Sequence, residues 1–182
     1  MNLKTYQKEA KRTCPTLGSD KLDLCHMVLG IGSETEELYK AMVTNDKVNI
    51  LEEIIDKFWY IANYCTFREY NLEELYNDRY SFTEESWEVQ TEVEIIKFSK
   101  LQDYIKKYIA YNKEINRELE QNALKGILWS LDEVLCQEEL NLKEGLEKNI
   151  NKLKVRFPEK FDENLAKNRN LELERKTLEG NG

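Results

Sequence analysis

Apolar residues recur at helical spacing along most of the chain, and no segment alternates apolar and polar residues as a β-strand does. The spacing predicts a short helix over 3–13, which ends before Pro15 because the residue preceding a proline disfavours helical geometry. A second helix begins at Ser19 or Asp20 and runs to the polar turn at 44–47. Its expected apolar positions are Leu22, Cys25, Leu29, Leu38, Ala41 and Met42.

The rest of the chain continues this pattern. Further helices are expected over 50–70, 87–111, 115–140 and 142–155, with a short helical turn at 72–76. Gly30 and Gly32 weaken the second helix by about 1 kcal/mol each, which indicates close packing or a local break. We therefore predict an all-α fold, a helical bundle of five or six helices built around one antiparallel hairpin.

The pattern also predicts the domain organisation. Residues 1–162 are expected to form a single domain, in which 71–120 is an insertion or extra helix. Residues 163–182 are a charged C-terminal arm, either docked or frayed.

A faint internal repeat occurs at an offset of 70 residues, where Phe58-Trp59 aligns with Leu128-Trp129 and 69–72 with 139–142. Two amphipathic helices followed by similar polar helix starts also match this well by chance, so duplication and coincidence both stay open.

Composition and charge exclude several classes of protein. The chain has 182 residues, 41% of them hydrophobic and 34% charged, which is typical of a folded domain. The uncharged stretch at 58–67 is well short of the roughly 20 residues that a membrane span needs. The net charge of −8 makes the average surface repel phosphates, so neither nucleic acid nor a membrane is an expected partner. Residues 148–182 nevertheless carry a net +3, which leaves −11 for residues 1–147.

The cysteines and the single histidine restrict the chemistry further. Cys14, Cys25, Cys65 and Cys136 form no C-x-x-C pair, and we expect reduced thiols in or near the core. The N-terminus lacks the apolar stretch of a secretory signal, so a cytoplasmic location is expected. We expect His26 to be packed and hydrogen-bonded. An ordinary zinc site has too few ligands here, so any metal would be held by oxygen.

Two acidic pairs supply such oxygens. Glu34 and Glu37 lie three residues apart on one predicted helix, and Glu53 and Asp56 lie three apart on the next, so each pair shares a helical face. In an antiparallel hairpin about the turn at 44–47, Glu37 comes level with Glu53 and Glu34 with Asp56, each to within about 1.5 Å of helix rise. Four carboxylates then converge on one patch.

Four carboxylates at this range raise one another's pKa unless a cation compensates. Mg²⁺ or Mn²⁺ is the expected cation, because hard divalent ions take oxygen ligands and Mg²⁺ accepts substrate phosphates as well. A ferritin-like di-iron site needs Glu-x-x-His couplets, which neither helix supplies. The remaining alternative is a solvated acidic face, although Asp56 stands inside the apolar run 54–59.

The residues around these acids resemble a known family. Gly-x-Gly-Ser-Glu-Thr-Glu-Glu-Leu at 30–38 and Glu-Glu-Ile-Ile-Asp-Lys-Phe-Trp-Tyr-Ile-Ala-Asn at 52–63 are similar to the all-α nucleoside triphosphate pyrophosphohydrolases of the MazG-like group. The resemblance covers 5–66 and 146–170, whereas 71–120 matches nothing in that group.

The resemblance implies Mg²⁺-dependent hydrolysis of a nucleoside triphosphate between the α and β phosphates, giving the monophosphate and pyrophosphate. Glu37 or Glu53 would orient or deprotonate the attacking water. Asn63 would hydrogen-bond the substrate, and Lys152 and Arg156 would neutralise its phosphates. The implied metal ligands are Glu34, Glu37, Glu53 and Asp56.

The family also implies a homodimer or higher oligomer. If the repeat is genuine, Glu53 and Asp56 correspond to Ala123 and Gly126, so the second copy lacks ligands and completes the bundle instead. Two alternatives stay open: a non-catalytic helical interaction protein, and a hydrolase of phosphoribosyl nucleotides or guanosine polyphosphate alarmones. The base and sugar are not determined, because residues scattered over several helices would build that part of the pocket.

Overall fold

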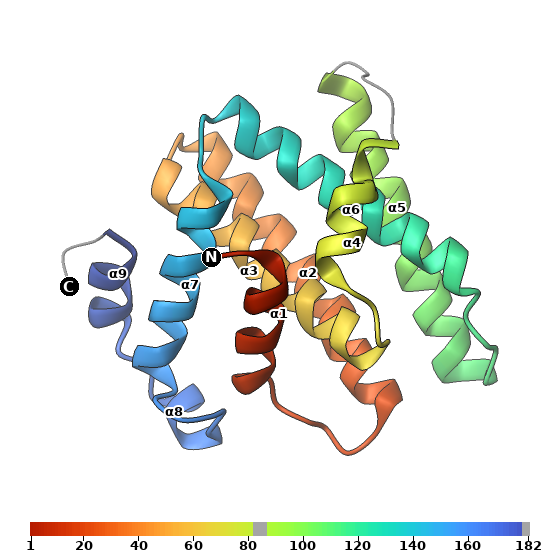
Figure 1. Cartoon of the computed structure of the whole chain (residues 1–182), viewed down its shortest axis with the longest axis horizontal. Coiled ribbons are helices and arrows are strands. Elements are labelled where there is room, and N and C mark those ends of the chain that lie inside the picture. The colour runs from red at the N-terminus through yellow and green to blue at the C-terminus, as the bar shows by residue number, and fades with distance from the viewer. Residues whose placement is uncertain (82–86, 180–182) are drawn as a thin grey trace.

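The computed structural model describes residues 1–81 and 87–179, and side chains for all of these except 80, 81 and 87–92. This part of the chain consists of helices joined by short turns, with no strand (Figure 1). The all-α bundle predicted from the sequence is confirmed. The helices are α1 (Leu3–Arg12), α2 (Asp20–Val43), α3 (Lys47–Phe67), α4 (Leu72–Asn77), the 3₁₀-helix η1 (Asp78–Ser81), α5 (Trp87–Tyr111), α6 (Arg117–Gln137), α7 (Leu142–Arg156), α8 (Glu163–Lys167) and α9 (Leu171–Glu179).

The described residues form nine α-helices, where the sequence predicts five or six. The additional ones are short, and two of them, α8 and α9, lie in the C-terminal arm. Side-chain caps stabilise such helices: Asn71 accepts from the backbone N–H groups of Glu73 and Glu74 before α4, and Asp162 caps α8 similarly. These caps satisfy backbone donors locally, so helices too short to show a hydrophobic period still form.

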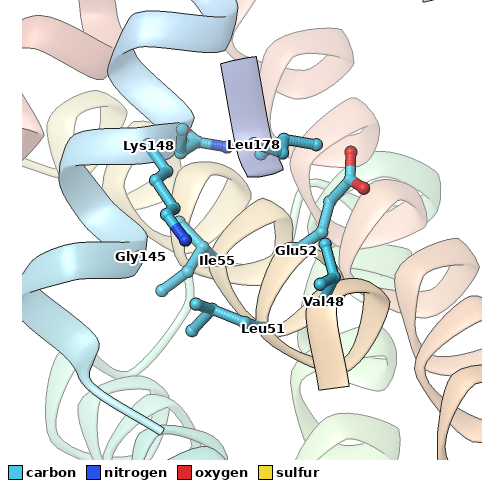
Figure 2. Close-up of a pocket in the computed structure, with 8 residues that line it drawn as sticks. Val48, Leu51, Glu52, Ile55, Gly145, Lys148 and Leu178 are labelled. Carbon is cyan, nitrogen blue, oxygen red and sulfur yellow. The ribbon is translucent and has the colours of Figure 1, made fainter. Parts of the chain in front are cut away.

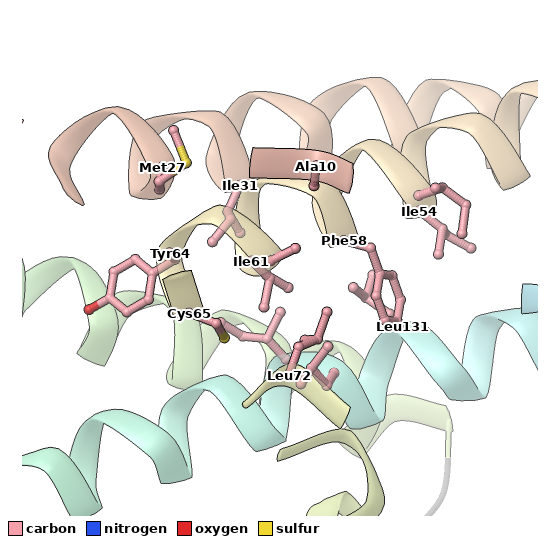
Figure 3. Packing of buried hydrophobic residues seen from close by; sticks show 14 of the residues in the cluster. Ala10, Met27, Ile31, Ile54, Phe58, Ile61, Tyr64, Cys65, Leu72 and Leu131 are labelled. Carbon is pink, nitrogen blue, oxygen red and sulfur yellow. The ribbon is translucent and has the colours of Figure 1, made fainter. Parts of the chain in front are cut away.

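Two antiparallel hairpins make the centre of the bundle. Helices α2 and α3 pack along their lengths, α5 and α6 form the second pair, and α5 also contacts α2 (Figure 1). The segment 71–120, expected as an insertion, thus contributes one of the four long helices. Ile31, Ile54 and Phe58 lie between the hairpin and its neighbours, and Leu131 of α6 closes the core from the other side (Figure 3). Helices α1 and α7 flank α3.

The buried face of α2 differs from the expected one. Leu22 and Leu29 are 52% and 64% exposed, and Leu38 and Ala41 are buried as predicted. The first half of the helix instead buries Leu24, Met27, Val28 and Ile31. Apolar residues cover more than one stripe of this half, so periodicity alone does not select the stripe that meets α3.

The turns are those that the sequence indicates. Ser19 caps α2, and Asp46 caps α3 by accepting from the N–H of Asn49. Asn45 adopts a left-handed conformation with φ 53° between them. Gly30 and Gly32 lie within a continuous α2, so they serve close packing and not a break.

The local structure repeats at an offset of 70 residues. Helices α3 and α6 have bounds that differ by this number at both ends. Each is followed by a glutamate with positive φ, Glu69 at 56° and Glu139 at 57°, and then by a capping asparagine, Asn71 or Asn141. These shared details are what an internal duplication predicts.

All four cysteines are free. Cys65 is buried and Cys14 and Cys25 are half-buried, but Cys136 is exposed, contrary to the expected near-core position. Cys136 lies in the last turn of α6, on the side that faces away from the core. None of the helices in the described part of the chain has both the length and the apolar character that a bilayer crossing requires.

Candidate metal centre

The hairpin of α2 and α3 brings three of the four predicted acids together. Glu34, Glu37 and Glu53 each offer a carboxylate oxygen, and these oxygens lie within 4.8 Å of one another. Among the described residues, this is the only group of three or more histidine, cysteine, aspartate or glutamate side chains so arranged. Glu37 is exposed, whereas Glu34 and Glu53 are half-buried. The cluster is therefore open to solvent on the Glu37 side.

Asp56, the fourth predicted ligand, is not part of this group. Its carboxylate accepts from Lys152 Nζ at 2.7 and 3.0 Å and from Asn149 Nδ2 at 2.5 Å. Both partners come from α7, and Lys152 is only 2% exposed. A buried ammonium requires a carboxylate partner, and Asp56 supplies it by turning toward α7.

Burial and mutual repulsion raise the pKa values of the clustered acids. Burial and the nearby charge of Asp56 raise the pKa of Glu34 to about 7 and that of Glu53 to about 9. A hydrogen bond between these two carboxyl groups raises the pKa of Glu53 further and partly offsets the rise in the pKa of Glu34. A bound cation would lower both pKa values. The three side chains offer only carboxylate oxygens, and their negative charges favour a bound cation. These ligands fit Mg²⁺ or Mn²⁺.

A buried hydrogen-bonded network supports the centre from behind. The Tyr6 hydroxyl, fully buried, donates to Asn149 Oδ1 at 2.9 Å, and Asn149 donates in turn to Asp56. Lys152 Nζ also donates to Glu52 Oε1 at 3.0 Å. Helices α1, α3 and α7 are thereby tied together directly beneath the acidic cluster.

A cavity of about 410 Å³ opens above the acids. Glu34, Glu37 and Glu53 form one wall together with Asp56 and Glu52. The remaining lining combines aromatic rings with the cationic side chains of Arg156 and Arg169. A cavity lined by acidic, basic and aromatic side chains suits a ligand that carries a metal ion, several negative charges and a planar group.

The aromatic wall depends on a missing side chain. A Cβ added at Gly30 would lie 2.1 Å from Cε1 of Tyr60, so only glycine lets this ring pack against α2. Tyr60 meets the rings of Trp59 and His26 edge to face, with centroids 5.0 and 5.9 Å apart. Trp59 Nε1 donates to Thr13 Oγ1 at 3.0 Å, which fixes the indole at the cavity edge.

The basic wall comes from α7 and the segment after α8. Arg156 donates through Nε and Nη2 to Glu174 of α9 at 2.9 and 2.5 Å, and Arg169 Nη2 donates to the same carboxylate at 2.8 Å. Glu174 is 3% exposed and does not line the cavity, whereas both arginines do. The carboxylate therefore meets the two guanidinium groups from the side away from the cavity.

The remaining predicted substrate contacts have mixed outcomes. Arg156 lines the cavity, as expected. Lys152 also lines it, but its ammonium is engaged by Asp56 and Glu52. Asn63 is 1% exposed and does not belong to the cavity wall; its Nδ2 donates to the carbonyl of Trp59 at 3.0 Å. Asn63 lies on the same face of α3 as Asp56, but its side chain turns back along the helix to the Trp59 carbonyl.

Sequence reasoning missed several residues of this site. No role is predicted from the sequence for Arg169, although it lies in a segment that carries the family resemblance; Tyr60, expected in the core together with Trp59, lines the cavity. His26 was expected to be hydrogen-bonded; it lines the cavity instead, and its buried Nδ1 has no partner among the described residues. Asn149 and Glu174 show no local signal, because their partners lie far away in the sequence.

No protein-family model matches this chain, and neither a curated protein nor a solved structure does. The functional interpretation therefore depends on the residues and on their geometry.

Proposed function

We propose that this chain is a Mg²⁺-dependent nucleotide pyrophosphohydrolase, which cleaves a nucleoside triphosphate between the α and β phosphates. The observation that supports it most is the convergence of Glu34, Glu37 and Glu53 within 4.8 Å at a cavity that also carries two arginines. A solvated acidic face, the alternative interpretation, does not explain why these carboxylates and two guanidinium groups line the same cavity of about 410 Å³.

The proposed roles follow from the chemistry of each wall. Glu34, Glu37 and Glu53 would hold the cation, with Asp56 adjacent to them. When bound, Mg²⁺ supplies charge neutralisation and Lewis-acid activation of the phosphate and the attacking water. We assign to Glu37, the exposed member of the cluster, the acceptance of the proton that the water loses on attacking the α phosphorus.

The arginines would stabilise the leaving group. Arg156 and Arg169 each present guanidinium N–H groups, which bind phosphate oxygens through short charge-assisted hydrogen bonds. The bond between the α phosphorus and the bridging oxygen breaks, and pyrophosphate departs with its charge balanced by these cations. The rings of Trp59 and Tyr60 provide a surface on which a planar base can stack.

A panel of nucleotides tested with Mg²⁺, followed by pyrophosphate detection, tests the proposal. Phosphoribosyl nucleotides and guanosine polyphosphates belong in the panel, because the same acids and arginines would serve those phosphoanhydrides. Turnover of one class identifies the substrate. If no member of the panel is turned over and Mg²⁺ does not change the thermal stability, a non-catalytic interaction protein becomes the better assignment.

Three variants make the test specific. Glu37→Gln and Glu53→Gln should each abolish pyrophosphate release while the far-UV circular dichroism stays unchanged. Glu36→Gln is the matched control: Glu36 is exposed on the same helix and pairs with Lys40 instead of lining the cavity. If Glu37→Gln and Glu53→Gln both retain turnover, the assignment is wrong.

A further inference from the structure

The C-terminal helix α9 is docked on the body of the protein through Leu178, through Glu174 and through a hydrogen bond from Arg175 to Asn49 of α3. Leu178, 6% exposed, lines a small niche together with Val48 and Leu51 of α3 and Gly145 of α7 (Figure 2). Gly145 keeps the niche open, since a Cβ there would come within 2.8 Å of Leu51. The second contact is the carboxylate of Glu174, which pairs with the two arginines of the cavity wall.

Glu174 engages only some of the guanidinium nitrogen atoms of Arg156 and Arg169. Glu174 occupies Nε and Nη2 of Arg156 but only Nη2 of Arg169, and no other hydrogen bond from either guanidinium to a described residue is present. Nη1 of Arg156 and two nitrogens of Arg169 therefore stay available to an anion. Two cations and one anion also leave the cluster with a net positive charge facing the cavity.

A carboxylate in this position changes what the arginines can do. An unrestrained arginine loses side-chain conformational entropy when a ligand immobilises it, whereas an arginine already held by an ion pair has lost part of that entropy before the ligand binds. A competing carboxylate would have to lie inside the cavity, where the anion binds. Glu174 lies behind the arginines, outside the cavity lining, so it orders them without occupying the anion's place.

We propose that Glu174 is a positioning residue: through Arg156 and Arg169, helix α9 controls the affinity of the cavity for the phosphates of its ligand without touching that ligand. This proposal rests on the proposed function, in which the ligand is a substrate with a pyrophosphate group. The C-terminal arm then belongs to the ligand-binding site, although it lies beyond the part of the chain that carries the acidic cluster.

Isothermal titration calorimetry with inorganic pyrophosphate in the presence of Mg²⁺ tests the inference on the full chain. Glu174→Gln should weaken pyrophosphate binding about tenfold, equivalent to about 1.4 kcal/mol. It should raise KM for any nucleotide that is turned over, with kcat changed less than KM. Glu174→Asp, which keeps the charge, should recover part of the affinity. Glu172→Gln is the control, because Glu172 is 82% exposed on the same helix and its one ion pair with a described residue is to Lys176.

Loss of folding would not obscure the result. Leu178→Ala releases the apolar anchor of α9 while leaving every charge in place, and thermal unfolding of each variant reports whether the body is intact. We expect Leu178→Ala to weaken pyrophosphate binding in the same direction as Glu174→Gln. If instead Glu174→Gln binds pyrophosphate as tightly as the Glu172→Gln control, or more tightly, the carboxylate is a spectator or a competitor and the inference is wrong.

The measurements distinguish a failure of the hydrolase assignment from a failure of the positioning role. If pyrophosphate affinity depends on Glu174 but no nucleotide is hydrolysed, the hydrolase assignment fails and the positioning role stands. If nucleotides are hydrolysed and Glu174→Gln equals the control, the positioning role fails and the hydrolase assignment stands. A wild-type protein that binds no pyrophosphate overturns the positioning role.

Discussion

Two glycines on one helix provide a sharp test of how the aromatic wall is built. At Gly30 an added Cβ would lie 2.1 Å from the Tyr60 ring, about 1.3 Å short of the 3.4 Å at which ordinary contact begins. At Gly32, two residues further along the same helix, the nearest atom is Phe98 Cζ at 3.0 Å, the far end of a flexible side chain. The same substitution should therefore have opposite effects at the two positions.

The magnitudes follow from two competing terms. Replacing a mid-helix glycine by alanine contributes about 1 kcal/mol of helix propensity at either position. At Gly30 the forced movement of Tyr60 costs about 1–3 kcal/mol, so Gly30→Ala should lose up to about 2 kcal/mol of unfolding free energy. Gly32→Ala should gain up to about 1 kcal/mol. A gap of about 2 kcal/mol corresponds to roughly 4–8 °C in Tm for a domain of this size.

Thermal and urea unfolding of the two variants, monitored by far-UV circular dichroism, measures this gap. Displaced toward the cavity, the Tyr60 ring should also raise KM for a nucleotide substrate in Gly30→Ala only. Adding Tyr60→Leu should recover part of the lost stability, and the double-mutant cycle isolates that coupling. The reasoning is refuted if Gly30→Ala is as stable as Gly32→Ala, or if removing the ring gives no recovery.

Three further predictions concern charge. Burial opposes ionisation of Glu174, but hydrogen bonds from Arg156 and Arg169 hold its pKa at about 2. Since this is below the ordinary value of 4.5, its contribution is complete above pH 4.5 and lost as the pH falls toward 2; acid unfolding of Glu174→Gln should lack that component. Glu120 is fully buried and accepts hydrogen bonds from Arg68 and from the hydroxyl groups of Tyr64 and Tyr70. Glu120→Ala should lower the free energy of unfolding, measured in urea, by about 3–5 kcal/mol. A loss under about 1 kcal/mol would contradict this. Saturation with Mg²⁺ at about 100 times its Kd should stabilise the wild type by about 2.7 kcal/mol in differential scanning calorimetry; an equal gain in Glu53→Gln would place the ion elsewhere.

Much of the fold was readable from local spacing. The helix α5 has the predicted bounds, and the cap at Ser19 and the turn near Asn45 follow from residue types within a few positions of each other. The acidic cluster is local in the same sense. Glu34 and Glu37 share a face by helical geometry, and one tight turn brings Glu53 beside them.

The chain's long-range contacts were not readable in this way. Asp56 was expected beside the other acids, but it is held by Lys152, 96 residues away. Lys152 was expected to face phosphate, and Asn63 was expected at the substrate; both side chains are engaged with protein groups. A side chain's choice among distant partners depends on how α7 packs on α3, and local periodicity contains no information on that packing.

The sequence by itself therefore determined the longer helices, the hairpin and the three carboxylates that meet within it, because all three depend on backbone geometry over short separations. Only the tertiary structure decided which face of α2 is buried, where Asp56 turns, and that Glu174 meets Arg156 and Arg169 behind the cavity wall. The face of α2 depends on which apolar stripe meets α3, and the turns of Asp56 and Glu174 pair them with cationic side chains from distant parts of the sequence, so both depend on the packed chain and not on any one segment.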